Sequence, residues 1–370
     1  MSHATLVTGG AGFIGAHLSN ELLEAGDSIR VLDALVPQVH GSSTRPPYLS
    51  RDVDLVVGDV RDRQAVRRAL EGIDRVVHFA ARVGVGQSMY EIAEYTSVNA
   101  AGTAVLLEEL ISQPVERLLV ASSMSVYGEG LYVDRTGATV ENARRSRDQL
   151  ERGCWEVADD DGEPLTPVPT PESKPPALSS VYAMNKFDQE RLCLLFGDAY
   201  KVKTTALRFF NVYGPFQSLQ NPYTGALAIF ASRLLNRRPP LIFEDGLQRR
   251  DFVHVRDVAR ACARALESDD AAEQVVNVGS GRSVTMVEVA RLLARTLGTA
   301  IEPEIVSTYR VGDIRHCFAD VSLATRLLGF VPEISLDDGL AELGAWLEGQ
   351  VPVDSVETAR DELAARGLTV

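Results

Sequence analysis

The sequence predicts an α/β protein in which a doubly wound parallel sheet carries a smaller, interwoven C-terminal α/β lobe. Three observations support this prediction. Short apolar runs alternate with helical patterns from the first residues, a glycine-rich turn joins the first run to the first helical pattern, and 370 residues exceed one average domain. Strands that alternate with helices form parallel sheets with helices on both faces.

The first part of the chain supplies most of the predicted sheet. Its expected strands are residues 4–7, 28–32, 53–57, 76–79, 118–121 and 204–209, and its expected helices are 13–25, 63–70, 97–110 and 180–200. After residue 210 the alternation loosens. We expect a loop over 211–220, a return of 253–266 to the surface of the sheet, a strand at 275–278, and helices over 227–235, 286–297, 336–347 and 354–366, the last with Asp354 as its N-cap.

These elements divide the chain into two interwoven units. Residues 1–210 form the sheet domain, with 129–178 inserted into it and 252–278 returning to it, and residues 211–251 plus 279–370 form the second lobe. The inserted segment is acidic and rich in proline. A connection this long inside a compact core is either a solvated surface insertion or a lid over an active site, and the sequence leaves both alternatives open.

The bulk composition argues against several classes of function. A net charge of −14 opposes broad binding to nucleic acid or to an anionic membrane, and no apolar run reaches the roughly 18 residues of a membrane span. Cys154, Cys193, Cys262 and Cys317 are scattered, which predicts neither a metal site nor a disulfide framework. Because the chain enters a strand at once without a signal-peptide pattern, we expect a protein of the reducing cytoplasm.

A Gly-x-x-Gly-x-x-Gly pattern, formed by Gly9, Gly12 and Gly15, lies between the first strand and the first helix. Small residues let the backbone approach a pyrophosphate. The free N–H groups around Phe13 and Ile14, at the start of the helix, attract its negative charge. This strand–turn–helix context predicts a dinucleotide-binding Rossmann domain.

The ends of the next strands extend the predicted cofactor site. Asp33 ends the second strand, where a carboxylate accepts hydrogen bonds from both adenosine ribose hydroxyls and repels a 2′-phosphate, which favours NAD over NADP. Asp59 and Val60 follow the third strand at the expected adenine edge, although Asp59 alternatively caps the next helix. The remaining expected cofactor residues are Ala80 and Ala81, after the fourth strand, and Asn99, which orients the loop beneath the nicotinamide.

A Tyr-x-x-x-Lys pair, Tyr182 and Lys186, predicts proton transfer at an alcohol carbon beside the cofactor. The two side chains share one face because they are one helical turn apart. Free tyrosine has a pKa of about 10, too high for an efficient base at neutral pH, and a nearby lysine cation favours the phenolate. We expect Ser123 to complete a Ser/Tyr/Lys set at the reacting oxygen of the substrate, and Ser122 to face the nicotinamide amide.

Together these motifs resemble those of the extended short-chain dehydrogenase/reductase family, and within it the nucleotide-sugar epimerases and dehydratases. The resemblance rests on four segments, which are residues 8–15, 122–128, 182–186 and 208–215. It implies a retained NAD, a hydride taken from the sugar, and a 4-keto intermediate.

The residues after Ser123 separate the reactions of this family. Its 4,6-dehydratases carry an Asp-Glu pair there, which supplies the acid and base for loss of water, and its UDP-glucuronate decarboxylases place a glutamate there. This chain has Met124 and Ser125, which supply neither group. What remains is oxidation at C4, rotation of the keto sugar and re-reduction on its other face, which is a 4-epimerase reaction.

Further segments resemble sequences assigned as dTDP-L-rhamnose 4-epimerases, namely residues 222–225, 245–255 and the proline-rich run before Ser179. The resemblance implies a nucleotide-diphosphate sugar as substrate: a dTDP-6-deoxyhexose such as dTDP-L-rhamnose, or a related UDP- or GDP-hexose. Those relatives often carry a cysteine-rich insertion. Cys154 alone stands in the corresponding part of this chain, so no metal is expected.

The same resemblance implies contacts to the substrate. Arg250 and Arg310 match family positions that hold the diphosphate, since guanidinium groups suit phosphate geometry. Asn211 matches a position that contacts the diphosphate or the sugar. The expected contacts to sugar hydroxyls are Gln87, Ser88 and Tyr223.

The resemblance also bears on assembly and on alternative functions. In relatives, helices equivalent to 97–110 and 180–200 build a four-helix dimer interface, so we expect a homodimer. One alternative function is a dehydratase or reductase of the same family, although a reductase consumes free NADPH and Asp33 opposes that cofactor. Another is a non-catalytic dinucleotide-binding sensor, although such proteins usually lose the Tyr/Lys pair that is present here.

Overall fold

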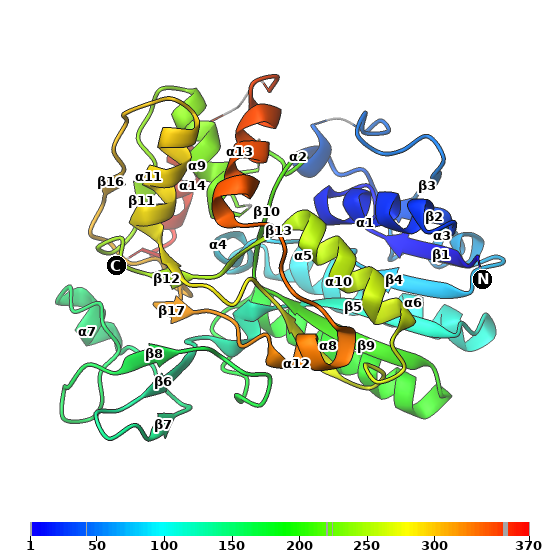
Figure 1. The fold of residues 1–370 in the computed structure, drawn as a ribbon, viewed down its shortest axis with the longest axis horizontal. Helices are drawn as coiled ribbons and strands as arrows, with labels where there is room; N and C mark the ends of the chain where they lie inside the picture. The colour runs from blue at the N-terminus through cyan, green and yellow to red at the C-terminus, as the bar shows by residue number, and fades with distance from the viewer. Residues whose placement is uncertain (1, 42, 220, 224, 351–353, 370) are drawn as a thin grey trace.

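The computed structural model describes residues 2–41, 43–219, 221–223, 225–350 and 354–369. Gln220, at the end of the expected loop, and Thr224, in the segment 222–225, lie outside the described residues. The central sheet has seven parallel strands in the order β14-β9-β5-β4-β1-β2-β3 (Figure 1). Its strands are β1 (Ala4–Thr8), β2 (Ser28–Asp33), β3 (Asp54–Val57), β4 (Arg75–His78), β5 (Arg117–Ser123), β9 (Lys203–Phe209) and β14 (Val275–Val278).

Helices cover both faces of this sheet, and Figure 1 shows the layers. One face packs against α1 (Phe13–Glu24) and α10 (Val255–Glu267), and the other packs against α3 (Arg63–Ala69), α6 (Gly102–Ser112) and α8 (Val181–Tyr200). Successive strand residues point to opposite faces, so Val7 joins the first apolar cluster and its neighbour Leu6 joins the second. The predicted doubly wound Rossmann sheet is confirmed.

The second lobe has its own apolar core, formed mainly by α9 (Ala226–Leu235), α11 (Met286–Thr296) and α13 (Leu336–Leu347). One short strand pair, β10 (Asn211–Tyr213) with β13 (Phe252–His254), joins the lobe to the segment that returns to the sheet domain. Within the lobe, β11 (Leu241–Ile242) pairs with β16 (Glu304–Ile305), and β12 (Arg249–Arg250) pairs with β15 (Val284–Thr285) and β17 (His316–Cys317). The remaining helices are α2 (Pro37–His40), α4 (Val85–Ser88), α5 (Ile92–Thr96), α12 (Ser322–Leu328), α14 (Val356–Ala365), the π-helix η1 (Ser97–Ala101) and the 3₁₀-helix η2 (Met124–Tyr127).

The inserted segment 129–178 folds as a small unit of its own. It contains an antiparallel sheet of β6 (Leu131–Val133), β7 (Thr139–Val140) and β8 (Thr166–Val168). The short helix α7 (Arg147–Glu151) lies between β7 and β8 in the sequence. Tyr132, Val157 and Leu165 form its core. None of its residues, all of which are described, lines either of the two cavities discussed below. This placement favours a surface insertion over a lid.

Three local expectations differ from the structure. The expected loop over 211–220 begins with β10, which pairs with β13; nothing in the local sequence indicates this distant partner. The expected helix over 97–110 begins as η1 before it continues as α6. The N-cap of α14 is Ser355 and not Asp354, although the Asp354 carboxylate still accepts a hydrogen bond from the Val356 N–H at 3.1 Å.

Candidate active site

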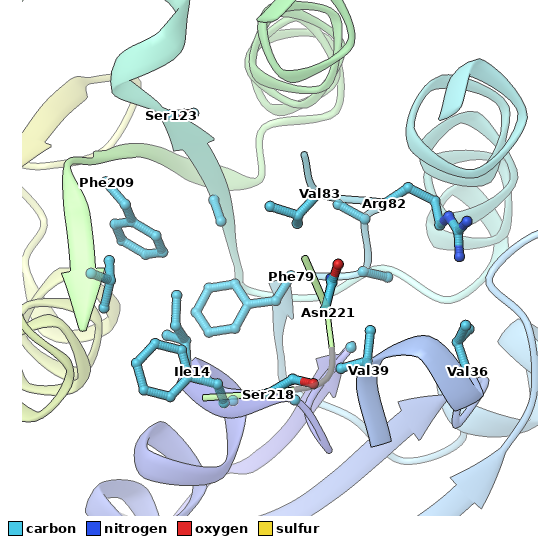
Figure 2. A pocket seen from close by; sticks show the side chains of 18 of the residues that line it. Ile14, Val36, Val39, Phe79, Arg82, Val83, Ser123, Phe209, Ser218 and Asn221 are labelled. Atoms are coloured by element: carbon cyan, nitrogen blue, oxygen red, sulfur yellow. The ribbon is translucent and has the colours of Figure 1, made fainter. Parts of the chain in front are cut away.

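Two cavities meet at the carboxyl-terminal edge of the parallel sheet. The first, of about 410 Å³, is lined by the glycine-rich turn and by residues at the ends of β1, β2, β4 and β5, and Figure 2 shows Ile14, Phe79 and Val39 around it. The second, of about 320 Å³, extends between the sheet domain and the second lobe. Ser123, Tyr182 and Asn211 line both cavities. A molecule in one cavity therefore meets a molecule in the other beside these three side chains.

The glycine-rich turn brings backbone very close to neighbouring backbone. Gly9 has a φ of +68°, and a Cβ there would lie 2.7 Å from the Ala80 nitrogen. A Cβ on Gly15 would lie 2.5 Å from the Gly10 Cα. Gly12 is the N-cap of α1, and among the described residues no side chain caps this helix. The open turn and the uncapped helix start fit a pyrophosphate at Gly9, Gly12 and Gly15.

Asp33 lies at the end of β2 and lines the first cavity, with a side chain that is almost fully buried. One carboxylate oxygen accepts a hydrogen bond from the Ala11 N–H (3.0 Å), and the other accepts one from the Leu35 N–H (2.9 Å). His40 Nε2 lies 3.4 Å from the second oxygen. These contacts hold the carboxylate where an adenosine ribose fits, and its negative charge opposes a 2′-phosphate.

The third strand leads to Asp59 and Val60, which both line the first cavity. The alternative that Asp59 caps the next helix is wrong, because Asp62 is the N-cap of α3 and accepts a hydrogen bond from the Gln64 N–H. Asp59 instead pairs with Arg61 (2.6 Å), and these hydrogen bonds lower the pKa of the carboxyl group. Arg61 also lines the cavity and was missed in the sequence, since nothing local marks a paired surface arginine as a cavity residue.

The loop after β4 also contributes to the first cavity. Ala80 and Ala81 line the first cavity. Asn99 is fully buried and does not line it. Its side-chain amide instead accepts a hydrogen bond from the Arg82 N–H (2.7 Å) and donates one to the Arg82 carbonyl (3.1 Å). Asn99 thus positions the loop rather than contacting a ligand itself.

The two serines at the end of β5 point to opposite sides, as successive strand residues do. Ser123 faces the cavities, and its hydroxyl oxygen accepts a hydrogen bond from the Ser125 hydroxyl at 2.9 Å. Ser122, although it borders the first cavity, directs its hydroxyl toward α8 and donates to Glu190 at 2.6 Å. Glu190, which is also paired with Arg208 (2.7 Å), therefore already accepts the hydrogen bond of the Ser122 hydroxyl, and a contact of Ser122 with the nicotinamide amide stays a prediction.

Tyr182 lies in the first turn of α8, where both cavities meet. Burial raises the pKa of its hydroxyl to about 12, and a hydrogen bond with Ser123 acts in the opposite direction. Burial also lowers the pKa of Lys186, one turn further along, to about 8. A cationic cofactor ring near Tyr182 would add a positive charge that lowers the pKa of the phenol.

Lys186 is held by a buried chain of hydrogen bonds that the sequence analysis missed. Its ammonium group donates to the Gln189 side-chain oxygen at 2.7 Å, and the Gln189 amide nitrogen donates to the Thr103 hydroxyl at 2.9 Å. His78 contacts this hydroxyl at 2.8 Å through Nε2 and the Thr8 hydroxyl at 2.7 Å through Nδ1. The chain therefore joins α8 to the strand that precedes the glycine-rich turn.

The expected substrate residues divide into two groups. Asn211, Tyr223, Arg250 and Arg310 line the second cavity. The Asn211 side-chain oxygen is buried and accepts no hydrogen bond from the described residues, so it is available to a ligand.

Gln87 and Ser88 line neither of these two cavities, and direct contacts from them to a sugar stay a prediction. The Gln87 side chain is bonded to Tyr95 (3.1 Å) and Glu91 (3.0 Å). The Ser88 hydroxyl accepts a hydrogen bond from the Tyr182 N–H at 3.0 Å, so Ser88 positions the start of α8.

The two expected cations of the second cavity already have partners within the chain. Arg250 donates to the carbonyl groups of Arg249 (2.9 Å) and Arg315 (3.0 Å) and to that of Ile314. Arg310 pairs with Asp313 (2.7 Å). Both guanidinium groups are therefore held in place at the cavity wall.

Comparisons with known proteins agree with this arrangement. The sequence model of the NAD dependent epimerase/dehydratase family matches residues 5–279. The chain is 37% identical over 346 residues to dTDP-L-rhamnose 4-epimerase of Burkholderia thailandensis, covering 92% of this chain and 94% of that protein. UDP-glucose 4-epimerase of Thermotoga maritima, solved with UDP-glucose, has a TM-score of 0.77 and 30% identity, covering 93% of this chain and 98% of that one. UDP-glucose 4-epimerase of Thermus thermophilus, solved with NAD, has a TM-score of 0.75 and 30% identity, covering 94% and 100% of the two chains.

The chain therefore belongs to the NAD-dependent epimerase/dehydratase family. It is an enzyme of the nucleotide-sugar epimerase class within that family, and NAD is its cofactor. The predictions of this family and this cofactor are confirmed. Across the described ranges, no helix combines the length and apolar character needed to cross a bilayer, and no three His, Cys, Asp or Glu side chains are grouped to hold a metal ion.

The burial of His78 predicts a loss of stability in acid. Burial, with a contribution from Lys186, lowers the pKa of His78 to about 3, whereas the unfolded chain titrates near 6.5. Between these values the unfolded chain binds the proton and the folded chain does not, so the free energy of unfolding falls as the pH falls below about 6.5. We expect His78 to account for a loss of about 2 kcal/mol between pH 7.5 and pH 5. Urea unfolding of the parent and of His78→Gln at both pH values measures this loss, and equal pH dependence in the two proteins would contradict it.

Proposed function

We propose that this protein is an NAD-dependent nucleotide-sugar 4-epimerase that acts on a dTDP-6-deoxyhexose such as dTDP-L-rhamnose. One observation carries the proposal: Ser123 and Tyr182 lie where the two cavities meet. The first cavity contains the glycine-rich turn and Asp33, so we place the cofactor there, with its pyrophosphate on Gly9, Gly12 and Gly15. The second cavity is then left for the nucleotide sugar.

The proposed chemistry assigns a proton to Tyr182 and orientation to its neighbours. NAD, when bound, supplies a reversible acceptor for the hydride of sugar C4. The Tyr182 phenolate accepts the proton of the C4 hydroxyl and later returns it to the ketone oxygen. Ser123 donates a hydrogen bond to that oxygen, and the Lys186 cation stabilises the phenolate. Because the tyrosine serves both half-reactions, no other acid or base is required.

The residues after Ser123 support epimerisation over loss of water. Met124 and Ser125 line the second cavity, and neither side chain carries a carboxylate. The Ser125 hydroxyl is already bonded to Ser123. A dehydratase needs an acid and a base at C5 and C6 of the sugar, and these two side chains provide neither. A dehydratase or reductase remains the alternative that the substrate experiment below distinguishes.

The choice of sugar rests on sequence similarity. The relative from Burkholderia thailandensis is a dTDP-L-rhamnose 4-epimerase and aligns along nearly the whole chain. The two UDP-glucose 4-epimerase structures from Thermotoga maritima and Thermus thermophilus are similar at lower identity, 30% each. The 6-deoxy sugar is therefore the first candidate, and a UDP- or GDP-hexose is the second.

Replacement of Tyr182 tests the proposed proton transfer. We expect Tyr182→Phe to bind NAD as the parent does but to lose at least about a hundredfold in kcat, the usual effect of removing a general base. Cofactor content of the purified protein, measured by absorbance after denaturation, and turnover measure the two properties. Phe187→Leu, on the same helix and outside both cavities, serves as the control. Near-normal turnover in Tyr182→Phe would overturn the mechanism.

A panel of substrates tests the function itself. The purified protein is incubated without added cofactor with dTDP-L-rhamnose, UDP-glucose, UDP-glucuronate and GDP-mannose, and the products are followed by NMR. We expect a C4 epimer from dTDP-L-rhamnose. A 4-keto-6-deoxy product would identify a dehydratase, and conversion only after addition of NADPH would identify a reductase. No product under any condition would favour a binding protein.

We further propose that the enzyme is a homodimer that pairs through α6 and α8. These helices pack against each other, and Ile111, Met184 and Leu195 are largely exposed on them. Burial of such apolar side chains against a second copy is favourable. We expect Met184→Glu with Leu195→Glu to convert a dimer into a monomer in sedimentation velocity, whereas Val331→Glu, at an exposed apolar position elsewhere, leaves it unchanged. A monomeric parent would contradict the proposal.

A further inference from the structure

The C-terminal helix α14 forms one wall of the second cavity. Val356, Ala359, Arg360 and Leu363 line the cavity. Their spacing of three and four residues places all four on one face of the helix. Leu363 also lies close to Gly86, since a Cβ there would be 3.4 Å from the leucine methyl groups. The helix, drawn in red in Figure 1, therefore presents these four side chains to the second cavity.

Polar contacts fasten this helix at several points. Glu357 pairs with Arg233 of α9 at 2.8 Å. The Glu362 carboxylate accepts hydrogen bonds from the hydroxyls of Tyr90 (2.8 Å) and Tyr223 (3.0 Å). Beyond the helix, the Val311 N–H donates to the Leu368 carbonyl at 2.9 Å, beside Arg310. The helix is thus fixed to both units of the fold around the cavity.

Arg360 differs from the other two cations of this cavity. Arg250 donates to backbone carbonyl groups and Arg310 pairs with Asp313, so part of their hydrogen-bonding capacity is used. Arg360 is partly buried, and within the described ranges its guanidinium group has neither a hydrogen bond nor an ion pair. An anion in the cavity would supply the charge-assisted hydrogen bonds that this partly buried guanidinium group lacks.

We propose that Arg360 binds the diphosphate of the nucleotide sugar, as a third cation supplied by the C-terminal helix. This inference rests on the proposed function, because it assumes that the second cavity holds a nucleotide sugar. Arg250 and Arg310 form the fixed part of the phosphate site, and Arg360 adds the guanidinium group of α14 to the same cavity. Val356, Ala359 and Leu363 line the same cavity with apolar side chains.

Titration calorimetry with nucleoside diphosphates tests the proposal. The proteins are the parent, Arg360→Ala, Arg360→Lys and Arg295→Ala, the last an exposed arginine of the same lobe outside both cavities. The probes are dTDP and UDP, with thymidine and uridine as ligands that lack phosphate. We expect Arg360→Ala to bind the diphosphates about tenfold or more weakly, Arg360→Lys to bind with intermediate affinity, and Arg295→Ala to match the parent. NAD content and nucleoside affinity should stay unchanged.

The outcomes separate the two proposals. If the parent binds dTDP or UDP and Arg360→Ala binds it equally well, the role of Arg360 is overturned and the proposed function stands. If Arg360→Ala weakens the binding of the nucleosides and of the nucleoside diphosphates equally, the helix shapes the site of the base and the assignment of Arg360 to the diphosphate is wrong. If the parent binds neither diphosphate, the proposed function fails and the inference fails with it.

Discussion

The candidate active site depends on the buried hydrogen-bond chain that joins Thr8 to Lys186. His78 stands at its centre, neutral and fully enclosed, and connects the strand before the glycine-rich turn to α8 through Thr103 and Gln189. Every link is short, so the distance between the cofactor turn and the Lys186 side chain is fixed. A buried polar network of this kind is stable only when its members are satisfied, which makes each link sensitive to substitution.

A second constraint holds the two units of the fold together. Asp251, between β12 and β13, is fully buried, and its carboxylate accepts hydrogen bonds from the N–H groups of Ser280 (2.6 Å), Gly281 (2.9 Å) and Ala319 (3.2 Å). Ser280 and Gly281 directly follow β14 of the central sheet, and Ala319 follows β17 of the second lobe. The second cavity forms where the units meet, with Arg250 next to Asp251 in its wall. The same motif therefore anchors the lobe and positions one of the proposed phosphate ligands.

The sequence predicted those parts of the site whose residues belong to one turn or one helix. Gly9, Gly12 and Gly15 lie in one turn, and Tyr182 and Lys186 lie in one helix, so their spacing reports their geometry. Parallel strands with both faces buried appear in the sequence as continuous apolar runs, so the strands of the sheet could be predicted.

The rest depends on contacts between distant segments, and spacing does not report these. Gln189 is one polar residue among several on α8, and its bond to Lys186 is evident only in the fold. Gln87 and Ser88 follow a glycine-rich loop that borders the cavity, but their side chains turn away from it to hold Tyr95 and Tyr182. Asp59 and Asp62 both precede α3, and only the backbone geometry shows that Asp62 is the cap. Arg360 was not predicted as a site residue, because no local pattern shows that α14 packs beside the second cavity.

The arrangement of cations and small residues bears on how one tyrosine could serve both faces of a sugar. Arg250, Arg310 and Arg360 line the second cavity, whereas Gly84 and Gly225 line it together with Tyr182. A Cβ at Gly84 would lie 2.9 Å from the Tyr223 side chain, so no larger residue fits there without displacement. Under the proposed function, the three guanidinium groups bind the diphosphate, and Ser123 and Tyr182 lie beside the sugar carbon that reacts. Because these are separate groups, the keto sugar can rotate to present its other face to Tyr182 while the arginines keep the diphosphate bound.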